Sequence, residues 1–224
     1  AILIKPDYIE AYFSLSMVSQ ELGEFNNMIA HSKKVLEINP NLDMVHNSIG
    51  FGFKELGQLD AAISSYQDAL SINPNNSEAH NNLGNIFEEL GKTNQAVKAY
   101  KAAIKISPDF PTLHNNLGNA FIDLRRLDDA LIAFKDALIH NPDYHESLNS
   151  LGVTLFKTGD HTEAIRVLKK AIKVKPDFVD AYLNLSEILK QTDQRDEAKE
   201  CLRNAIQVNP DVADIHNNLG ALFY

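Results

Sequence analysis

The segment Ser77–Phe110, SEAHNNLGNIFEELGKTNQAVKAYKAAIKISPDF, contains the pattern that decides the fold. Gly91 separates two halves, and a glycine able to adopt a left-handed conformation commonly ends a helix. Pro108 ends the second half, because proline cannot donate a backbone hydrogen bond and clashes with the preceding turn. In both halves apolar residues recur at helical spacing, which predicts two amphipathic, antiparallel helices. These residues are Ala79, Leu83, Ile86, Phe87 and Leu90, then Ala96, Val97, Tyr100, Ala103, Ile104 and Ile106.

The same pattern repeats along the chain with a period of 34 residues. A fixed period of roughly 20–50 residues indicates a repeat architecture. Small residues occupy three further columns, represented by Gly84, Ala96 and Ala103, and small side chains let two helices approach closely. The prolines that mark the period are Pro6, Pro40, Pro74, Pro108, Pro142, Pro176 and Pro210.

The period, the small columns, Phe87 with Tyr100, and the final Pro108 resemble the tetratricopeptide repeat family. The resemblance covers the whole chain and implies an all-α fold: a right-handed superhelical solenoid of antiparallel helix pairs. We expect six tandem 34-residue units over residues 9–212, forming a single solenoid domain. Residues 1–8 parallel the end of a preceding repeat, and residues 213–224 parallel the first helix of a seventh.

Two units and both ends depart from the common pattern. In the first unit Ser16 and Met28 replace the usual Gly and Ala, and in the sixth Asp193 replaces the mid-unit glycine. We still expect a helix pair in each. Neither end has the polar capping helix that solenoids usually carry, so we expect the chain to be a fragment of a longer protein.

The composition argues against several classes of function. The chain has 224 residues, of which 21 are Lys or Arg and 30 are Asp or Glu, with a formal net charge of −9. Phosphate binding needs clustered Lys and Arg, so we expect neither nucleic acid nor a membrane as a partner. The single cysteine, Cys201, excludes an internal disulfide, and an inert apolar role is its expected one.

The signatures of an enzyme are also missing. There is no Gly-rich phosphate loop, no metal-spaced cysteine pair and no nucleophile elbow, so we expect no catalytic residue, metal or cofactor. One histidine column invites a metal interpretation, but its members lie on successive repeats about 10 Å apart. Zinc ligands must approach to about 2.0–2.1 Å, which favours packing instead. The column consists of His46, His80, His114 and His216, with Tyr12, Leu148 and Tyr182 at the equivalent positions.

Asparagines line one face of the predicted first helices. Asparagine forms helices about 0.5 kcal/mol less well than alanine, but its amide offers both a donor and an acceptor. A row of amides can hold the backbone of an extended peptide, and the resemblance implies that this face lines a concave groove. Two alternatives stay open: inheritance from one duplicated repeat, and amide bonds that serve only the superhelix. The residues, which we call the Asn ladder, are Asn47, Asn81, Asn82, Asn85, Asn115, Asn116, Asn119, Asn149, Asn184, Asn217 and Asn218.

Acidic residues flank the Asn ladder on the same helices. We call four of them the acidic rim: Glu78, Glu89, Asp123 and Glu146. At the edge of a groove their negative potential attracts basic segments. Solubilising charge and the helix macrodipole account for them equally well.

The sequence therefore predicts a protein-interaction scaffold that binds an extended peptide or partner segment, with a basic segment as one candidate. A second hypothesis is the substrate-recruiting arm of a larger enzyme. It rests on the Asn-Asn-Leu-Gly-Asn blocks at residues 81–85 and 115–119, which are similar to the array of O-linked N-acetylglucosamine transferases. A third is a structural array that self-associates through its uncapped ends.

Overall fold

The computed structural model describes residues 8–222. The chain forms two compact units, residues 1–108 and 109–224. The predicted end of a preceding repeat, residues 1–8, lies outside the described residues except for Tyr8. The same holds for the last two residues of the predicted segment 213–224.

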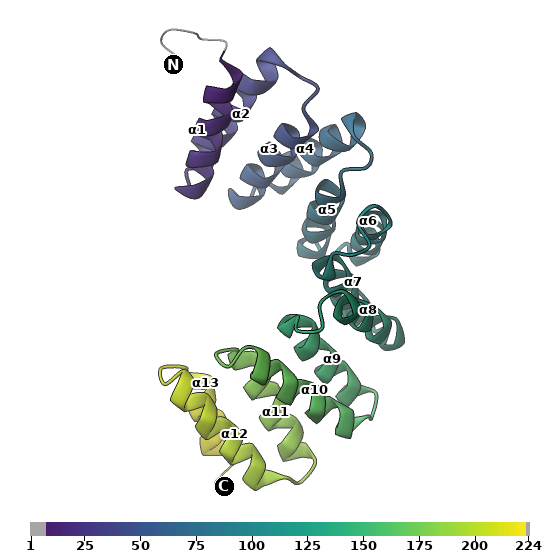
Figure 1. The fold of residues 1–224 in the computed structure, drawn as a ribbon, viewed down its shortest axis with the longest axis vertical. Coiled ribbons are helices and arrows are strands. Elements are labelled where there is room, and N and C mark those ends of the chain that lie inside the picture. Colours follow the sequence, from purple (N-terminus) through teal and green to yellow (C-terminus); the bar gives the residue numbers. More distant parts are fainter. Residues whose placement is uncertain (1–7, 223–224) are drawn as a thin grey trace. The chain divides into compact units, whose positions relative to one another are not determined.

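Unit 1 contains three helix pairs, coloured purple to teal in Figure 1. Each pair consists of a first helix and an antiparallel second helix, joined by a short turn. The first helices are α1 (Ile9–Glu21), α3 (Asp43–Glu55) and α5 (Ser77–Glu89). The second helices are α2 (Phe25–Ile38), α4 (Leu59–Ile72) and α6 (Thr93–Ile106).

Unit 2 contains three further pairs and one more first helix. Its first helices are α7 (Pro111–Asp123), α9 (His145–Lys157), α11 (Val179–Gln191) and α13 (Ala213–Ala221). Its second helices are α8 (Leu127–His140), α10 (His161–Val174) and α12 (Arg195–Val208). Residues 8–222 contain no strand, and the predicted all-α solenoid of antiparallel helix pairs is confirmed.

We call the first helices of a unit its first-helix layer. Each second helix packs against its own first helix and, where another first helix follows in the same unit, against that helix too, as α2 does with α1 and α3. Successive first helices also contact each other: α3 with α5 in unit 1, and α7 with α9, α9 with α11 and α11 with α13 in unit 2. One face of this layer carries the predicted site.

The column of small residues that includes Gly84 lets a large side chain of the second helix lie against the first helix. A Cβ atom on Gly84 would lie 2.4 Å from Cε1 of Tyr100, and one on Gly118 would lie 2.4 Å from Cε1 of Phe134. Both rings are completely buried. Such distances are far below van der Waals contact, so glycine is required wherever the facing residue is an aromatic ring.

The first pair solves the same contact differently. Ser16 stands in the glycine column, and Ser32 replaces the aromatic residue that faces this column in the next three pairs. Their hydroxyls lie 2.7 Å apart and both side chains are buried. Because the facing side chain is small, a Cβ on the first helix is tolerated, and the hydrogen bond satisfies both buried hydroxyls. The departure from the pattern is therefore a paired substitution.

The turn inside each pair uses a left-handed residue at one fixed position. Gly91 has φ +68°, and Arg125 and Asp193 adopt nearly the same conformation with φ +57° and +60°. A non-glycine residue pays a steric penalty there of about 1–2 kcal/mol. The fold thus keeps the turn even in the two pairs whose sequence lacks the glycine.

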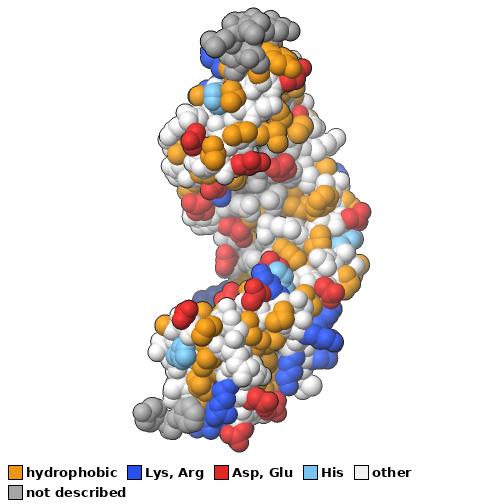
Figure 2. Space-filling view, turned by 60° about the vertical axis from the view of Figure 1, so that its left-hand side comes forward, with side chains coloured by type: hydrophobic (Ala, Val, Ile, Leu, Met, Phe, Trp, Pro, Cys, Tyr) orange, Lys and Arg blue, Asp and Glu red, His pale blue; other side chains and the backbone are white. Residues whose placement is uncertain are grey.

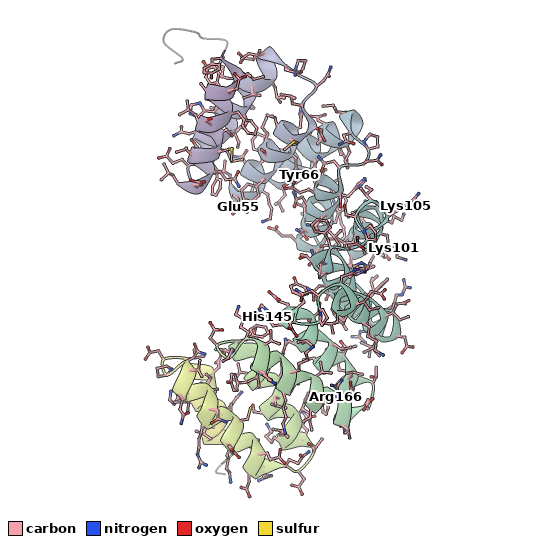
Figure 3. All side chains as sticks on the ribbon, in the orientation of Figure 1. Glu55, Tyr66, Lys101, Lys105, His145 and Arg166 are labelled. Atoms are coloured by element: carbon pink, nitrogen blue, oxygen red, sulfur yellow. The ribbon has the colours of Figure 1, made fainter. Side chains whose placement is uncertain are left out.

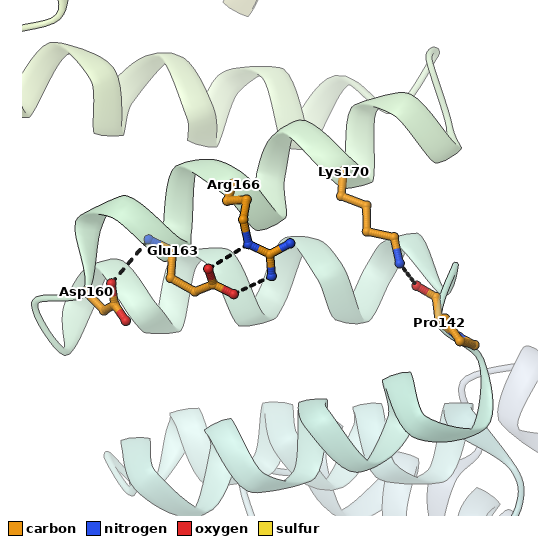
Figure 4. A network of polar contacts seen from close by, with 5 residues as sticks. All are labelled: Pro142, Asp160, Glu163, Arg166 and Lys170. Atoms are coloured by element: carbon orange, nitrogen blue, oxygen red, sulfur yellow. Dashed lines mark hydrogen bonds and ion pairs between the residues drawn. The ribbon is translucent and has the colours of Figure 1, made fainter.

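Exposed side chains of the second helices form hydrogen bonds and ion pairs, as α10 illustrates. In α10 the Asp160 carboxylate caps the helix by accepting from the Glu163 backbone N–H at 3.2 Å (Figure 4). Glu163 accepts from Nε of Arg166 at 2.7 Å, which lowers the pKa of its carboxyl group. Lys170 donates to the carbonyl oxygen of Pro142 and so joins α10 to the turn before α9.

Candidate functional site

The Asn ladder falls into three classes by exposure. Asn47 and Asn115 are buried, with 5% and 7% of their surface exposed, so their amides face protein. The other members reach the surface of the first-helix layer. Half-buried members are Asn81, Asn82, Asn85, Asn116, Asn149 and Asn184, and exposed members are Asn119, Asn217 and Asn218.

Two amide–amide hydrogen bonds link successive first helices. Asn82 on α5 donates from Nδ2 to Oδ1 of Asn47 on α3, at 3.3 Å. In unit 2 the equivalent bond runs from Asn184 on α11 to Asn149 on α9, at 2.9 Å. In each case the residues are 35 positions apart, so an amide pairs with the neighbouring column of the preceding repeat. Part of the ladder therefore holds the helix layer together.

Asn115 and Asn85 have their own internal partners. The Ser147 hydroxyl donates to Oδ1 of Asn115 at 2.9 Å, which joins α9 to α7. The Tyr100 hydroxyl lies 2.8 Å from Oδ1 of Asn85 and 2.6 Å from Oε2 of Glu88. Burial and the Glu88 carboxylate raise the pKa of Tyr100, so its hydroxyl stays protonated as a donor. Sequence reasoning missed Glu88, although its helical spacing from Asn85 places both on one side of α5.

The second pair contains the same tyrosine without these partners. Tyr66 is completely buried, and its hydroxyl has no hydrogen-bond partner among the described residues. The residues that replace Asn85 and Glu88 there are Phe51 and Lys54, and Lys54 pairs with Glu55 instead. Figure 3 labels Tyr66 and Glu55 in unit 1. Burial, together with the charges of Glu78 and Glu55, raises the pKa of Tyr66.

Three members of the acidic rim, Glu78, Glu89 and Asp123, are exposed. The fourth, Glu146, is half-buried, and its Oε2 atom lies 3.1 Å from Nδ1 of His145. These two groups form an ion pair when the imidazole is protonated.

Charge is unequally divided between the helices of unit 1. Helices α1, α3 and α5 carry seven carboxylates and one lysine, a net charge of −6. Helices α2, α4 and α6 carry three carboxylates and five lysines, a net charge of +2. Lys101 and Lys105 project from α6 on the side away from α5 (Figure 3), and carboxylates are prominent on the face of unit 1 in Figure 2. The first-helix layer is therefore the acidic side of this unit.

Three members of the histidine column tie a first helix to the turn before it. Nε2 of His46 lies 3.1 Å from the carbonyl oxygen of Pro40, and His80 and Pro74 repeat this contact at 3.1 Å. His216 and Pro210 repeat it at 2.7 Å. The imidazole thus anchors the proline turn, which gives the column a structural role. Within residues 8–222, no cluster of three or more His, Cys, Asp or Glu side chains could hold a metal ion.

Cys201 lies buried on α12, with Sγ 3.7 Å from the carbonyl oxygen of Tyr182. Burial raises the pKa of this thiol to about 12, so it is protonated at neutral pH and is a poor nucleophile. Among the described helices, none is long and apolar enough to cross a bilayer.

Solved structures that are similar to this chain include YrrB, MamA and PilF. YrrB, a TPR protein with an unusual peptide-binding site, is 21% identical over 83% of this chain and 96% of its own, with a TM-score of 0.66. MamA is 27% identical over 72% of this chain and 95% of its own, with a TM-score of 0.67. PilF of Pseudomonas aeruginosa is 18% identical over 95% of this chain and 97% of its own, with a TM-score of 0.80.

Family models match almost the whole length of the chain, whereas no curated protein matches it by sequence. A model described as TPR repeat matches residues 52–91 and 84–124. Models described as tetratricopeptide repeat match residues 9–42, 115–177 and 155–222. With the helix pairs described above, these matches show that the chain belongs to the tetratricopeptide repeat family.

Proposed function

We propose that this chain is a protein-interaction scaffold that binds an extended peptide across its first-helix layer, with the surface members of the Asn ladder contacting the peptide backbone. The repeat fold is in general a non-enzymatic interaction scaffold, and YrrB, which shares the fold, has a peptide-binding site. The observation that carries the proposal is the half-buried and exposed amides that recur on first helices in contact with one another within each unit.

The dimensions of the layer suit an extended peptide. Packed helices lie about 8–10 Å apart, and an extended chain rises about 3.3 Å per residue. Each helix pair therefore spans about three peptide residues, and a backbone group of the peptide meets an amide at regular intervals.

The amides retain bonding capacity after their internal contacts. An asparagine side chain has two N–H donors and an acceptor oxygen. Asn82 and Asn184 each use one N–H for the bond to the preceding helix. Because that bond fixes the orientation of the amide, the side chain loses little further freedom on binding a peptide.

The charge of the layer favours a basic peptide. The net charge of −6 on the first helices of unit 1 attracts Lys and Arg side chains and raises the rate of encounter. Exposed charge pairs contribute little to affinity at physiological salt, because solvent screens them. The amides therefore supply most of the affinity, and the carboxylates supply the preference for basic peptides.

The test is selection of peptides of roughly 9 residues, which span about three helix pairs and so fit within one unit, from a randomised library. A variant with Asn82, Asn116 and Asn184 changed to Ala removes three half-buried amides. The control changes Asn26, Asn94 and Asn204 to Ala, three exposed asparagines on second helices. Both variants are first checked for unchanged helicity.

We expect the parent and the control to select the same peptides, and the first-helix variant to bind them at least about tenfold more weakly, from the loss of amide hydrogen bonds to the peptide in whichever unit binds it. Equal binding by both variants contradicts the proposed role of the ladder. Selection of no peptide by the parent contradicts the proposed function itself.

A further inference from the structure

An apolar pocket lies at the junction between the first two helix pairs. Its volume is about 400 Å³, within the range of about 300–1,000 Å³ seen for ligand pockets. Phe13 of α1 and Met44 of α3 line it and are 38% and 67% exposed. Two carboxylates, Glu10 and Asp43, line it as well. Figure 2 shows apolar and acidic side chains close together on the surface of unit 1.

The next junction in unit 1 has a polar network at the equivalent place. There Asp43 accepts from Nδ2 of Asn73 at 2.7 Å and of Asn76 at 3.0 Å, beside the bond between Asn47 and Asn82. These hydrogen bonds join α3 to the turn before α5 and to α5 itself.

Three of the five members of that network have an apolar counterpart 34 residues earlier, whereas Asn73 and Asn82 have the polar counterparts Asn39 and Ser48. Ile9 stands in place of Asp43, Phe13 in place of Asn47, and Leu42 in place of Asn76. All three line the pocket. The Asn ladder thus stops at this junction, and a pocket for an apolar group takes the place of the amide pair.

We propose that this pocket binds one apolar side chain of the extended peptide, and that a neighbouring Lys or Arg of the same peptide pairs with Glu10 and Asp43. The inference rests on the proposed function. In that function the Asn ladder contacts only the peptide backbone, so the pocket adds recognition of the peptide's side chains. Burial of apolar surface stabilises the contact in proportion to the area removed from water.

The two carboxylates support a basic neighbour for the anchor. Asp43 is ionised at neutral pH, since its hydrogen bonds from Asn73 and Asn76 lower its pKa. Glu10 is exposed. Within residues 8–222 neither carboxylate forms an ion pair with a Lys or Arg. A cation from the peptide therefore meets two carboxylates without displacing a Lys or Arg of residues 8–222.

The test compares two variants that change equally exposed apolar residues. Met44→Lys places a charge at the pocket, and Leu22→Lys places one elsewhere in unit 1; both residues are 67% exposed. The probes are the best peptide selected by the parent chain, the same peptide with its apolar anchor changed to Ser, and the same peptide with the adjacent cation changed to Gln. Dissociation constants are measured by fluorescence anisotropy.

We expect loss of the anchor to weaken binding to the parent and to Leu22→Lys about tenfold, the effect of one buried apolar side chain. Met44→Lys should bind both peptides with similar affinity. Glu10→Gln should reduce the effect of removing the cation. Equal anchor effects in Met44→Lys and Leu22→Lys overturn the inference, as does a selected peptide without an apolar position.

Two outcomes separate this inference from the proposed function. If binding still needs Asn82, Asn116 and Asn184 but no apolar anchor, the pocket assignment fails and the scaffold stands. If sedimentation shows self-association of the chain that Met44→Lys abolishes, the occupant is a second copy and the peptide assignment is overturned.

Discussion

The second and third helix pairs place a tyrosine at the same position, yet only one hydroxyl is satisfied. Tyr66 and Tyr100 are both completely buried against a glycine of the first helix. Tyr100 donates to the first helix, whereas Tyr66 has no partner among residues 8–222. The repeat therefore dictates the shape of the contact, while the polar partners are set separately in each pair.

The contact between a glycine and a tyrosine ring, which both pairs share, should have the largest effect on stability. A Cβ at Gly84 would lie 2.4 Å from the Tyr100 ring, and one at Gly50 would lie 2.6 Å from the Tyr66 ring. We expect Gly84→Ala and Gly50→Ala each to lower the free energy of unfolding by about 2–3 kcal/mol through overpacking. Urea denaturation measures this. Gly220→Ala is the control, because among residues 8–222 no neighbouring atom lies within 4 Å of a Cβ there; a similar loss in the control would refute the packing explanation.

Removal of the two hydroxyls should change the free energy of unfolding in opposite directions. Tyr100→Phe removes the hydroxyl that donates to Asn85 and Glu88 on the first helix and should lower the free energy of unfolding by about 1–2 kcal/mol. Tyr66→Phe removes an unsatisfied buried hydroxyl and should leave stability unchanged or raise it by about 1 kcal/mol. Thermal unfolding of both variants beside the parent is sufficient. Destabilisation by Tyr66→Phe equal to that by Tyr100→Phe would show that Tyr66 has a partner.

An exposed polar contact should matter least. The ion pair between Glu163 and Arg166 lies in solvent, so we expect Arg166→Gln to cost about 0.5 kcal/mol or less after screening. Because Arg166 lowers the pKa of Glu163, its contribution is present near neutral pH and is lost as pH falls through the lowered pKa. The difference between parent and variant should therefore vanish in acid. A difference that persists at low pH would exclude the ion pair as its cause.

The sequence predicts the repeat frame well because that frame depends on local, periodic features. Gly91 and Pro108 mark helix ends, and Gly84 marks the close contact. The same frame explains why Arg125 and Asp193 adopt a left-handed conformation without glycine: their turns are held by the helices on either side.

The status of individual side chains was harder to predict, because it depends on pairs of residues from different repeats. Asn47 looks equivalent to Asn81, but its amide is buried and bonded to Asn82. The 35-residue offset of this bond joins two columns that a 34-residue alignment keeps apart. The pocket at Phe13 likewise depends on residues of two repeats, since α1 and the start of α3 line it together.

The most direct test of the account is a side-chain amide NMR spectrum of the chain with and without the selected peptide. We predict that the amide signals of Asn82, Asn116 and Asn184 on the first helices shift on binding, while those of Asn26, Asn94 and Asn204 on the second helices do not. Shifts confined to the second-helix asparagines would contradict the assignment of the binding face.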